Sequence, residues 1–424
     1  MKLVAAALLA VASHALALAQ DLPVRVVTLR SPALGEERTV YILTPPGYER
    51  GERRYPVVYF TDGERTLPLL ATTARFLASA GRMPEVLLVG LAHPDRVRDL
   101  TPTHGKLEQG GGEEVSYETS GGGERFLAFL AQDLVPWVDR SYRTEPLRIL
   151  AGHSFGGLFA LHAMAARPGV FQAAIAASPT LGWDRDLAAR EVRDALGRKD
   201  GLSGTIVLTV GDEGRLAAAR FQELKGLLAR GGAVHLRALH LAGEDHVTTP
   251  FASYYAGLEE VFDGWSMPVS PEATGPRGGA AAVEAHYRAL SQRLGFAVPP
   301  PERALALSGL QLLSEGDRDG AVRTLRRTVE LYPSSPRARH ALGLALERSG
   351  ELEGARDAYR RAWEAAKAAG ARDAPAYEAS YHRASGATGT GRRSPASAGD
   401  ADVQTESRDR YGGYDRESRF DGGG

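Results

Sequence analysis

The segment from Arg148 to Gly169, RILAGHSFGGLFALHAMAARPG, constrains the fold most, because it sets one serine between two different structural patterns. The apolar run before the serine is typical of a buried strand, and the apolar residues three and four apart after it are typical of a helix. Ser154 lies between them in a G-x-S-x-G motif. Glycines two positions to either side leave room for the strained turn that exposes a serine hydroxyl. The motif predicts a nucleophile; the alternative is a small polar residue in a tight turn.

Strand and helix patterns alternate from about residue 22 to residue 265. This alternation predicts an α/β domain with a mostly parallel sheet flanked by helices. Helices are expected at GERFLAFLAQDLVPWVDRSY, after Ser154 and at residues 215–230. Besides the run before Ser154, strands are expected at RTVYILTPPGY, YPVVYFTDG, EVLLVGLA, AAIAAS, TIVLTVG and VHLRALHL.

The chain also divides by composition. Lys2, an apolar run and the sequence ALA before Gln20 predict a signal peptide at 1–19, and therefore an exported protein, periplasmic or secreted, with no membrane span in the mature chain. The alternative is an uncleaved anchor. The catalytic domain is expected at 20–266, a Pro- and Gly-rich linker at 267–279, a helical region at 280–384 and a disordered tail at 385–424.

The helical region shows a 34-residue period, which is typical of tetratricopeptide-like helical hairpins. We expect this small all-α region to pack on the catalytic domain, to mediate self-association or to bind a protein partner. The pairs that carry the period are Gly309 and Gly343, Gly316 and Gly350, Ala321 and Ala355, and Leu325 and Tyr359.

Composition excludes several function classes. The chain has no cysteine, so disulfides, thiolate metal sites and a cysteine nucleophile are excluded. The net charge of −1 comes without a basic stripe, which argues against nucleic acid as a partner. The histidines and acids lack the spacing of zinc ligands, and serine chemistry requires no metal or cofactor.

A serine hydroxyl needs a base to accept its proton. In an α/β-hydrolase the order along the chain is serine, acid, histidine. His246 follows the last expected strand, so we expect it to be the general base; His240 is expected to pack within that strand, and His153 to point the wrong way. The acid is expected at Glu213 or Asp212, directly after TIVLTVG. Each of these acids could instead cap the next helix.

The oxyanion that forms in such a reaction requires two backbone N–H donors. Phe155, directly after the serine, should supply one. The other should come from the loop at Gly63 and Glu64, after YPVVYFT.

Several blocks occur in order: YPVVYFTDG, LLVGLAHPDRVRDLTPTHG, the segment around Ser154, AASPTLGWD and GEDHVTTP. Over residues 22–265 they resemble the putative esterase family of α/β-hydrolases, which includes enterochelin (siderophore) esterases and is related to esterase D. The resemblance implies an ester hydrolase with the nucleophile at Ser154 and the histidine at His246, and leaves open a Ser-His dyad without an acid.

The resemblance also implies substrate-binding residues near the mouth of the site. These are Arg96, Arg98, Asp99 and Trp183. For Arg98 and Asp99 the alternative is a structural ion pair, and for Trp183 plain core packing.

The sequence thus predicts an exported serine ester hydrolase that acts on a small-molecule ester, first among them siderophore esters. Two rival functions remain. An acyltransferase would pass the acyl group to an alcohol, and a binding protein would use the helical repeats beside a vestigial hydrolase domain.

Overall fold

The computed structural model describes residues 23–108, 112–199, 201–270 and 272–386. Its chain falls into two units, Met1–Ser266 and Met267–Gly424. The expected signal peptide at 1–19 lies outside the described residues, as does the expected disordered tail apart from residues 385 and 386. Within the described ranges, no helix combines the length and apolar character needed to cross a bilayer.

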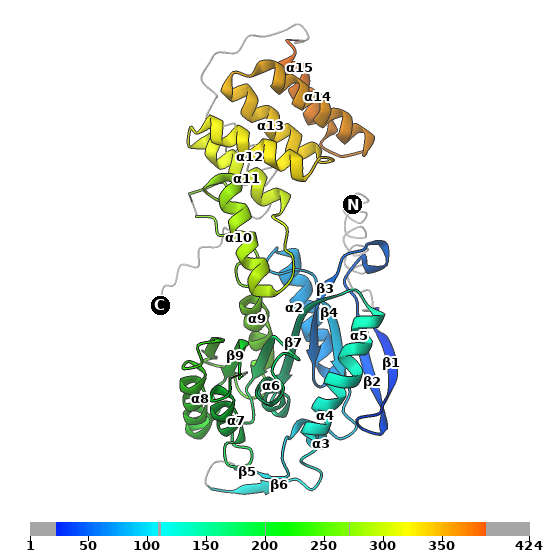
Figure 1. The fold of residues 1–424 in the computed structure, drawn as a ribbon, viewed down its shortest axis with the longest axis vertical. Coiled ribbons are helices and arrows are strands. Elements are labelled where there is room, and N and C mark those ends of the chain that lie inside the picture. Colours follow the sequence, from blue (N-terminus) through cyan, green and yellow to red (C-terminus); the bar gives the residue numbers. More distant parts are fainter. Residues whose placement is uncertain (1–22, 109–111, 200, 271, 387–424) are drawn as a thin grey trace, which may run out of the picture. The chain divides into compact units, whose positions relative to one another are not determined.

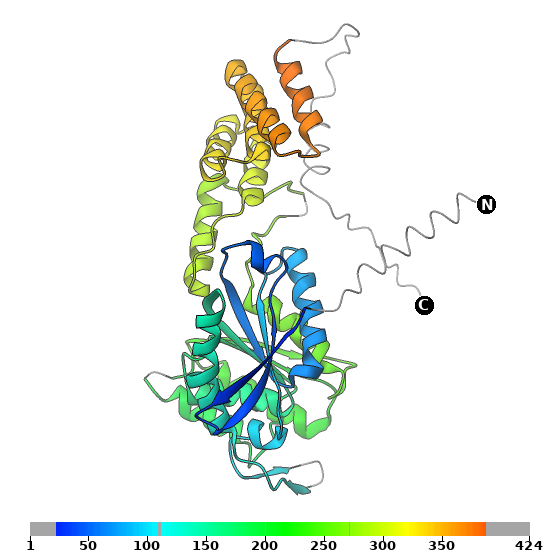
Figure 2. The ribbon, with the colours of Figure 1, turned by 90° about the vertical axis from the view of Figure 1, so that its right-hand side faces the viewer.

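The first unit is built on an eight-stranded sheet with the order β1-β2-β4-β3-β7-β8-β9-β10 (Figure 1). The six strands from β4 to β10 run parallel, whereas β2 is antiparallel to both β1 and β4. The prediction of a mostly parallel sheet is confirmed, and Figure 2 shows its twist. The strands are β1 Arg25–Ser31, β2 Glu36–Leu43, β3 Tyr55–Phe60, β4 Leu87–Leu91, β7 Thr144–His153, β8 Ala173–Ala177, β9 Gly204–Val210 and β10 Val234–His240.

Helices cover both faces of this sheet (Figure 1). On one face, α2 (Gly63–Ser79) and α9 (Thr249–Val261) pack against the strands and each other. The other face carries α4 (Gly123–Phe129), α5 (Val135–Ser141), α6 (Phe155–Ala166), α7 (Leu187–Leu196) and α8 (Gly214–Leu228). Short elements complete the unit: η1 Tyr48–Arg50, α3 Arg96–Leu100 and the hairpin of β5 (Lys106–Glu108) and β6 (Glu114–Ser116).

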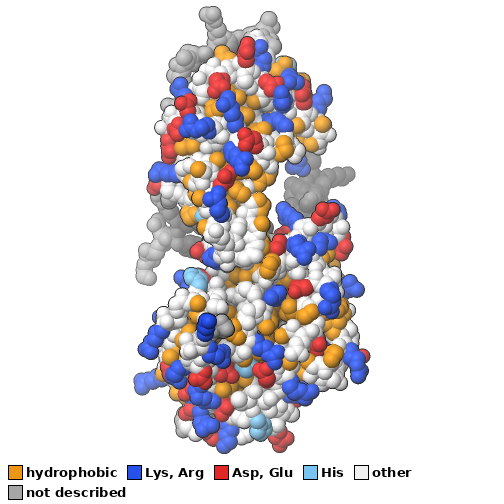
Figure 3. Space-filling model, viewed as in Figure 1, with side chains coloured by type: hydrophobic (Ala, Val, Ile, Leu, Met, Phe, Trp, Pro, Cys, Tyr) orange, Lys and Arg blue, Asp and Glu red, His pale blue; other side chains and the backbone are white. Residues whose placement is uncertain are grey.

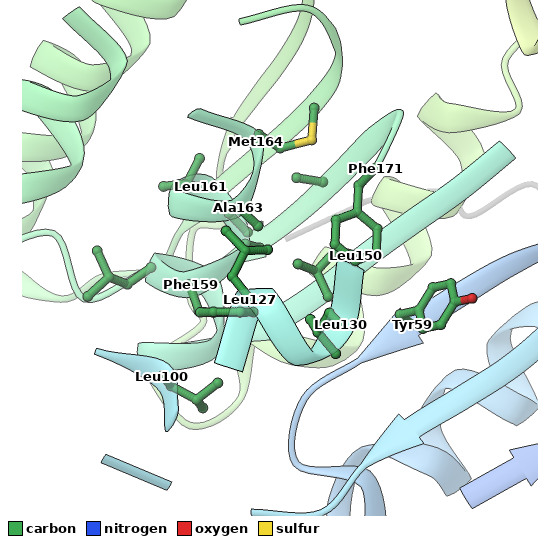
Figure 4. Close-up of a cluster of buried hydrophobic side chains, with 14 of the residues drawn as sticks. Tyr59, Leu100, Leu127, Leu130, Leu150, Phe159, Leu161, Ala163, Met164 and Phe171 are labelled. Carbon is green, nitrogen blue, oxygen red and sulfur yellow. The ribbon is translucent and has the colours of Figure 1, made fainter. Parts of the chain in front are cut away.

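The helix that follows Ser154 lies at the centre of the core. Residues Phe155 to Ala165 of α6 are all buried. A helix that is apolar all round has no face to offer to water, so it must be enclosed by its neighbours. Figure 4 shows Phe159 of α6 packed with Leu127 of α4 and with Leu150 of β7.

One expected helix is interrupted. The segment GERFLAFLAQDLVPWVDRSY was expected to form one helix, but a π-helical turn, η2 (Leu130–Leu134), separates α4 from α5. Pro136 lies in the first turn of α5 and has no N–H to donate to the preceding turn. The loss of that hydrogen bond explains why the regular helix is broken at this point.

A buried ion pair joins β2 to the short helix α3. The Arg38 guanidinium donates to Asp99, with Nη1–Oδ2 at 2.5 Å and Nη2–Oδ1 at 2.8 Å, and both side chains are 1% exposed. Burial alone would raise the pKa of Asp99, but hydrogen bonds from Arg38 and His93 hold it well below its ordinary value. Arg98 extends the network to Asp99 and Glu36. The network fixes the segment that carries Arg96.

The second unit is all-helical. It contains α10 Gly279–Leu294, α11 Glu302–Ser314, α12 Arg318–Leu331, α13 Pro336–Ser349, α14 Leu352–Ala368 and α15 Ala374–Ala384. The expected linker at 267–279 has neither helix nor strand before Gly279 among its described residues, and Thr274 donates its backbone N–H to Gln311 Oε1 at 2.7 Å.

The pairs of residues 34 positions apart occupy equivalent places in this unit. Any Cβ at Gly309 of α11 would lie 2.6 Å from Leu325 of α12, and any Cβ at Gly343 of α13 would lie 2.6 Å from Tyr359 of α14. The helices of each pair therefore approach closely over a glycine. Assignment of these hairpins as tetratricopeptide-like stays a prediction.

We expect Asp99→Asn to lower the free energy of unfolding of the first unit by about 3–5 kcal/mol, because it leaves the buried Arg38 without its charged partner. Since the pKa of Asp99 is lowered, its stabilising effect is complete above the ordinary value of 3.8 and is lost as the pH falls toward the folded-state pKa. Urea denaturation at pH 7 and from pH 4 down to the lowest pH at which the protein stays folded, with β2 and α3 followed by hydrogen exchange, measures both effects. Asp95→Asn is the matched control, because Asn still caps α3; equal effects of the two variants would contradict the prediction.

Gly343→Ala should destabilise the α13–α14 pair by about 1–3 kcal/mol, because the new methyl group would meet the fully buried Tyr359 ring. Gly354→Ala is the control, because Gly354 lies on the exposed surface of α14 and the new methyl group would come no closer than 3.4 Å to another atom; it should be neutral or slightly stabilising. Hydrogen exchange of peptides from α13 and α14 in the full chain measures the effect of each substitution. Unchanged protection in Gly343→Ala would show that the close approach is not required.

Candidate active site

Ser154 occupies a strained turn between β7 and α6. Its φ of 62° and ψ of −119° lie in a region that non-glycine residues rarely adopt. Any Cβ at Gly152 would lie 2.3 Å from the Gly156 backbone, and any Cβ at Gly156 would lie 2.1 Å from Thr61 Oγ1. Both flanking glycines are therefore required for the turn, as the motif predicted.

The structure brings Ser154, His246 and Glu213 into one hydrogen-bonded chain. Ser154 Oγ lies 3.0 Å from His246 Nε2, and His246 Nδ1 lies 2.7 Å from Glu213 Oε2. The three residues follow β7, β10 and β9, three strands whose carboxyl ends lie at the same edge of the sheet. This arrangement can take a proton from the serine hydroxyl and stabilise the imidazolium that results.

The Glu213 carboxylate is held in place by further donors. Oε1 accepts hydrogen bonds from the Ser178 hydroxyl and from the Gly211 N–H, the latter at 3.2 Å. Burial would raise the pKa of Glu213, but the hydrogen bonds from His246 and Ser178 outweigh it and lower that pKa below its ordinary value. Glu213 is therefore ionised at neutral pH and can orient the imidazole.

Asp212, the other acid considered, faces elsewhere. Its carboxylate accepts from His240 Nε2 and from the Gly243 N–H, both at 2.8 Å. The structure thus places Glu213, and not Asp212, beside His246. His240 was expected to pack within β10; that expectation is wrong, because its side chain is 51% exposed and pairs with Asp212 at the end of the strand.

His153 makes no hydrogen bond to Ser154 among those of the described residues and instead supports the loop of His246. Its Nε2–H donates to the His246 backbone carbonyl at 2.6 Å, and the two rings lie 4.7 Å apart. Burial, together with the nearby charges of His246 and Arg96, lowers the pKa of His153 to about 4. The ring is therefore neutral at pH 7 and acts as a hydrogen-bond donor that fixes the loop of His246.

Two helix N-termini border the serine. Phe155 is the first residue of α6, and Gly63 is the first residue of α2, which follows the parallel neighbour strand β3. The first N–H groups of a helix have no partner within it and favour negative charge. Gly63 also has to be glycine, because any Cβ there would lie 2.7 Å from Tyr41. The Glu64 side chain accepts a hydrogen bond from Tyr41 at 2.6 Å. A carboxylate cannot donate, so the group of Glu64 that could serve an oxyanion is its backbone N–H.

Arg96 ties these two loops together. Its Nε and Nη2 donate to the Asp62 carboxylate at 2.6 and 3.0 Å, and Nη2 also donates to the His153 carbonyl at 3.1 Å. Its guanidinium lies 5.8 Å from the centre of the Phe155 ring. Arg96 therefore lies directly behind the strained turn, with its side chain 35% exposed.

The other residues expected to contact substrate have structural partners instead. Arg98 and Asp99 belong to the buried network with Arg38 and Glu36 described above. Trp183 is fully buried, donates to Thr103 Oγ1 at 3.1 Å and packs edge-on against Phe155. For Asp99 and Trp183 the substrate-binding expectation is therefore wrong in this conformation, because no side-chain surface is left for a ligand.

The sequence reasoning missed two hydroxyl residues. Ser178 donates to Glu213, and Thr180 Oγ1 lies 3.2 Å from Ser154 Oγ. Both belong to the ASPT segment directly after the buried strand β8. Their position next to the carboxyl end of a parallel strand was the available signal, since ligands and reacting groups gather at that edge.

Replacing the acid should slow the serine chemistry selectively. Glu213→Gln is expected to reduce the rate at which a fluorophosphonate probe labels Ser154 by about 10²–10⁴-fold, because an amide favours the wrong imidazole tautomer. Asp212→Asn, one residue away, should change that rate by less than about threefold. If the two variants respond alike, Glu213 does not orient His246.

Comparisons with known proteins agree with this geometry. Residues 31–230 match the putative esterase family. The chain is 30% identical over 197 residues to the ferri-bacillibactin esterase BesA of Bacillus subtilis, a match that covers 42% of this chain and 66% of that protein. It is 37% identical over 109 residues to a siderophore enterobactin esterase of Emericella nidulans, covering 24% of this chain and 35% of that protein. The matched parts thus span less than two thirds of these relatives' lengths.

Solved structures share the fold. An IroE-like serine hydrolase from Shewanella oneidensis superimposes with a TM-score of 0.58 at 24% identity, over 76% of this chain and 99% of its own. An uncharacterised protein from Capnocytophaga ochracea superimposes with a TM-score of 0.63 at 17% identity, over 80% of this chain and 93% of its own. The α/β-hydrolase fold expected from the sequence is confirmed, and residues 31–230 are similar to the putative esterase family.

Proposed function

We propose that this protein is a serine carboxylic-ester hydrolase that works through an acyl-enzyme on Ser154. The observation that carries the proposal is the unbroken chain of hydrogen bonds from Ser154 through His246 to Glu213. The match of residues 31–230 to the putative esterase family supports the same reaction class. The proposed reaction uses only groups of this chain and water.

In the first half-reaction, Ser154 Oγ attacks the ester carbonyl while His246 Nε2 accepts the hydroxyl proton. The carbonyl oxygen becomes an oxyanion, for which we propose the N–H groups of Phe155 and of the Gly63–Glu64 turn as donors. The Glu213 carboxylate accepts a hydrogen bond from His246 Nδ1–H and so stabilises the imidazolium that forms on His246. The tetrahedral intermediate then collapses, and His246 gives the proton to the departing alcohol.

In the second half-reaction, water takes the place of the alcohol. His246 Nε2 accepts a proton from water as the water oxygen attacks the acyl carbon. The bond between the acyl carbon and Ser154 Oγ then breaks, the proton passes from His246 to Oγ, and the free acid leaves. The enzyme returns to its starting state.

Siderophore esters are the first substrate class that we propose. Two relatives with curated names are a ferri-bacillibactin esterase and a siderophore enterobactin esterase. Arg96, whose side chain is 35% exposed and binds Asp62 and the His153 carbonyl, is the contact that we propose for an anionic or catechol-bearing ester. Aryl esters and short acyl esters are the alternatives to compare with it.

We also propose that the protein is exported, on the strength of the N-terminal segment from Lys2 to Ala19. Acidic and basic side chains are interspersed over the face drawn in Figure 3, so that face offers no basic stripe for a nucleic acid. Self-association or a protein partner for the helical unit stays a prediction.

Labelling and hydrolysis test the proposed reaction together. The wild type should react with a fluorophosphonate probe and should release acid and alcohol from an ester panel of triscatecholate lactone, aryl and short-chain substrates. Ser154→Ala and His246→Ala should each lose both activities by at least about 10³-fold. Thr248→Ala, two residues from His246, is the control variant and should retain both.

The results separate the rival functions. A folded wild type that neither labels nor hydrolyses any ester would overturn the proposal. If added alcohols capture the acyl group in preference to water, the protein is an acyltransferase. If kcat/KM is higher for aryl or short-chain esters than for the lactone, siderophore esters are not the preferred substrates, but the protein is still an ester hydrolase.

A further inference from the structure

The loop after β8, residues 178–180, contacts both ends of the catalytic chain. Ser178 at its start donates to Glu213, and Thr180 at its end lies beside Ser154. The backbone also binds this segment to the turn. The Ser154 N–H donates to the carbonyl of Ala177, the last residue of β8, at 3.0 Å, and the Thr180 N–H donates to the Ser154 carbonyl at 3.1 Å. The position of the Thr180 side chain relative to Ser154 is thus set by main-chain hydrogen bonds.

The hydrogen-bond directions around Ser154 can be deduced from the chain. Glu213 is ionised and can only accept, so the proton of neutral His246 lies on Nδ1 and Nε2 is an acceptor. The Ser154 hydroxyl must then donate to Nε2, 3.0 Å away. A hydroxyl has one proton and two lone pairs. The 3.2 Å contact with Thr180 Oγ1 therefore has Thr180 as the donor and Ser154 Oγ as the acceptor.

We propose that Thr180 is a further catalytic residue, whose hydroxyl stabilises Ser154 Oγ as this oxygen leaves the acyl-enzyme. The inference rests on the proposed ester hydrolysis. When the bond between the acyl carbon and Oγ breaks, its electron pair moves onto Oγ, and His246 Nε2 delivers a proton there. Thr180 donates a hydrogen bond to the same oxygen while the charge builds up, and it neither gains nor loses a proton.

This contact acts more strongly on deacylation than on acylation, because Oγ starts each half-reaction in a different chemical state. Before acylation, Oγ is a hydroxyl oxygen that already accepts the hydrogen bond, so the bond strengthens only modestly as the proton moves to His246. In the acyl-enzyme, Oγ is an ester oxygen and a poor acceptor, so the hydrogen bond is gained mainly as the bond to the acyl carbon breaks. Thr180 therefore lowers the barrier to deacylation more than the barrier to acylation, a difference that a purely structural residue would not produce.

Thr180→Val tests the proposal, because valine keeps the shape and the backbone N–H but lacks the hydroxyl; Thr180→Ser restores a hydroxyl. With a p-nitrophenyl ester that the wild type hydrolyses, stopped-flow release of nitrophenol measures acylation, and mass spectrometry of quenched samples measures the acyl-enzyme. Thr180→Val should deacylate about tenfold more slowly and accumulate acyl-enzyme, with acylation slowed by less than about threefold. Thr180→Ser should deacylate within about threefold of the wild type.

The outcomes distinguish this inference from the proposed function. Normal fluorophosphonate labelling of all three proteins, with Thr180→Val showing neither acyl-enzyme accumulation nor slower turnover, would overturn the role of Thr180 alone. Equal losses in acylation and deacylation, not repaired by Thr180→Ser, would identify a structural residue and also overturn it. A folded wild type that forms no acyl-enzyme and does not label would overturn the hydrolase proposal itself.

Discussion

The strained, positive-φ backbone at Ser154 is the constraint on which the rest of the site depends. A non-glycine residue in such a conformation costs on the order of 1–3 kcal/mol and persists only where its surroundings enforce it. Here the enforcement comes from three directions: β7 before the turn, the fully buried α6 after it, and the end of β8 with the loop after it, which bind the N–H and the carbonyl of Ser154. Burial of α6 in the core thus stabilises the geometry that exposes the nucleophile.

Differences in burial and in hydrogen-bond partners give neighbouring acids and histidines of the site different roles. Glu213 and Asp212 are adjacent in sequence, yet one is largely buried beneath His246 and the other lies in solvent with His240. The two histidines that meet at the site divide similarly, because burial keeps His153 neutral while His246 is partly exposed and paired with a carboxylate. Arg96 links the Asp62 turn to the His153 carbonyl and so connects the two loops that flank Ser154.

Much of the fold could be predicted from local patterns. The buried parallel strands appear as continuous apolar runs, and the β7-turn-α6 motif is contiguous in sequence, so both were identified. Edge strand β1 was missed because its residues are mostly exposed or half-buried and carry no apolar run. The π-helical turn at Leu130–Leu134 was missed because the apolar period continues through it while Pro136 interrupts the hydrogen bonding. In the helical unit, the 34-residue period located the glycines over which paired helices approach each other.

The sequence by itself determined the strained serine turn, the order of the strands along the chain and the candidate residues at the strand ends, because each depends on neighbours within a few positions. Only the tertiary structure decided between Glu213 and Asp212. It also paired the half-exposed Arg98 with the buried Asp99, enclosed Trp183, and brought Thr180 to Ser154. These outcomes depend on distances between segments tens of residues apart. The packing of the helices against the sheet sets these distances, and the local sequence pattern does not encode that packing.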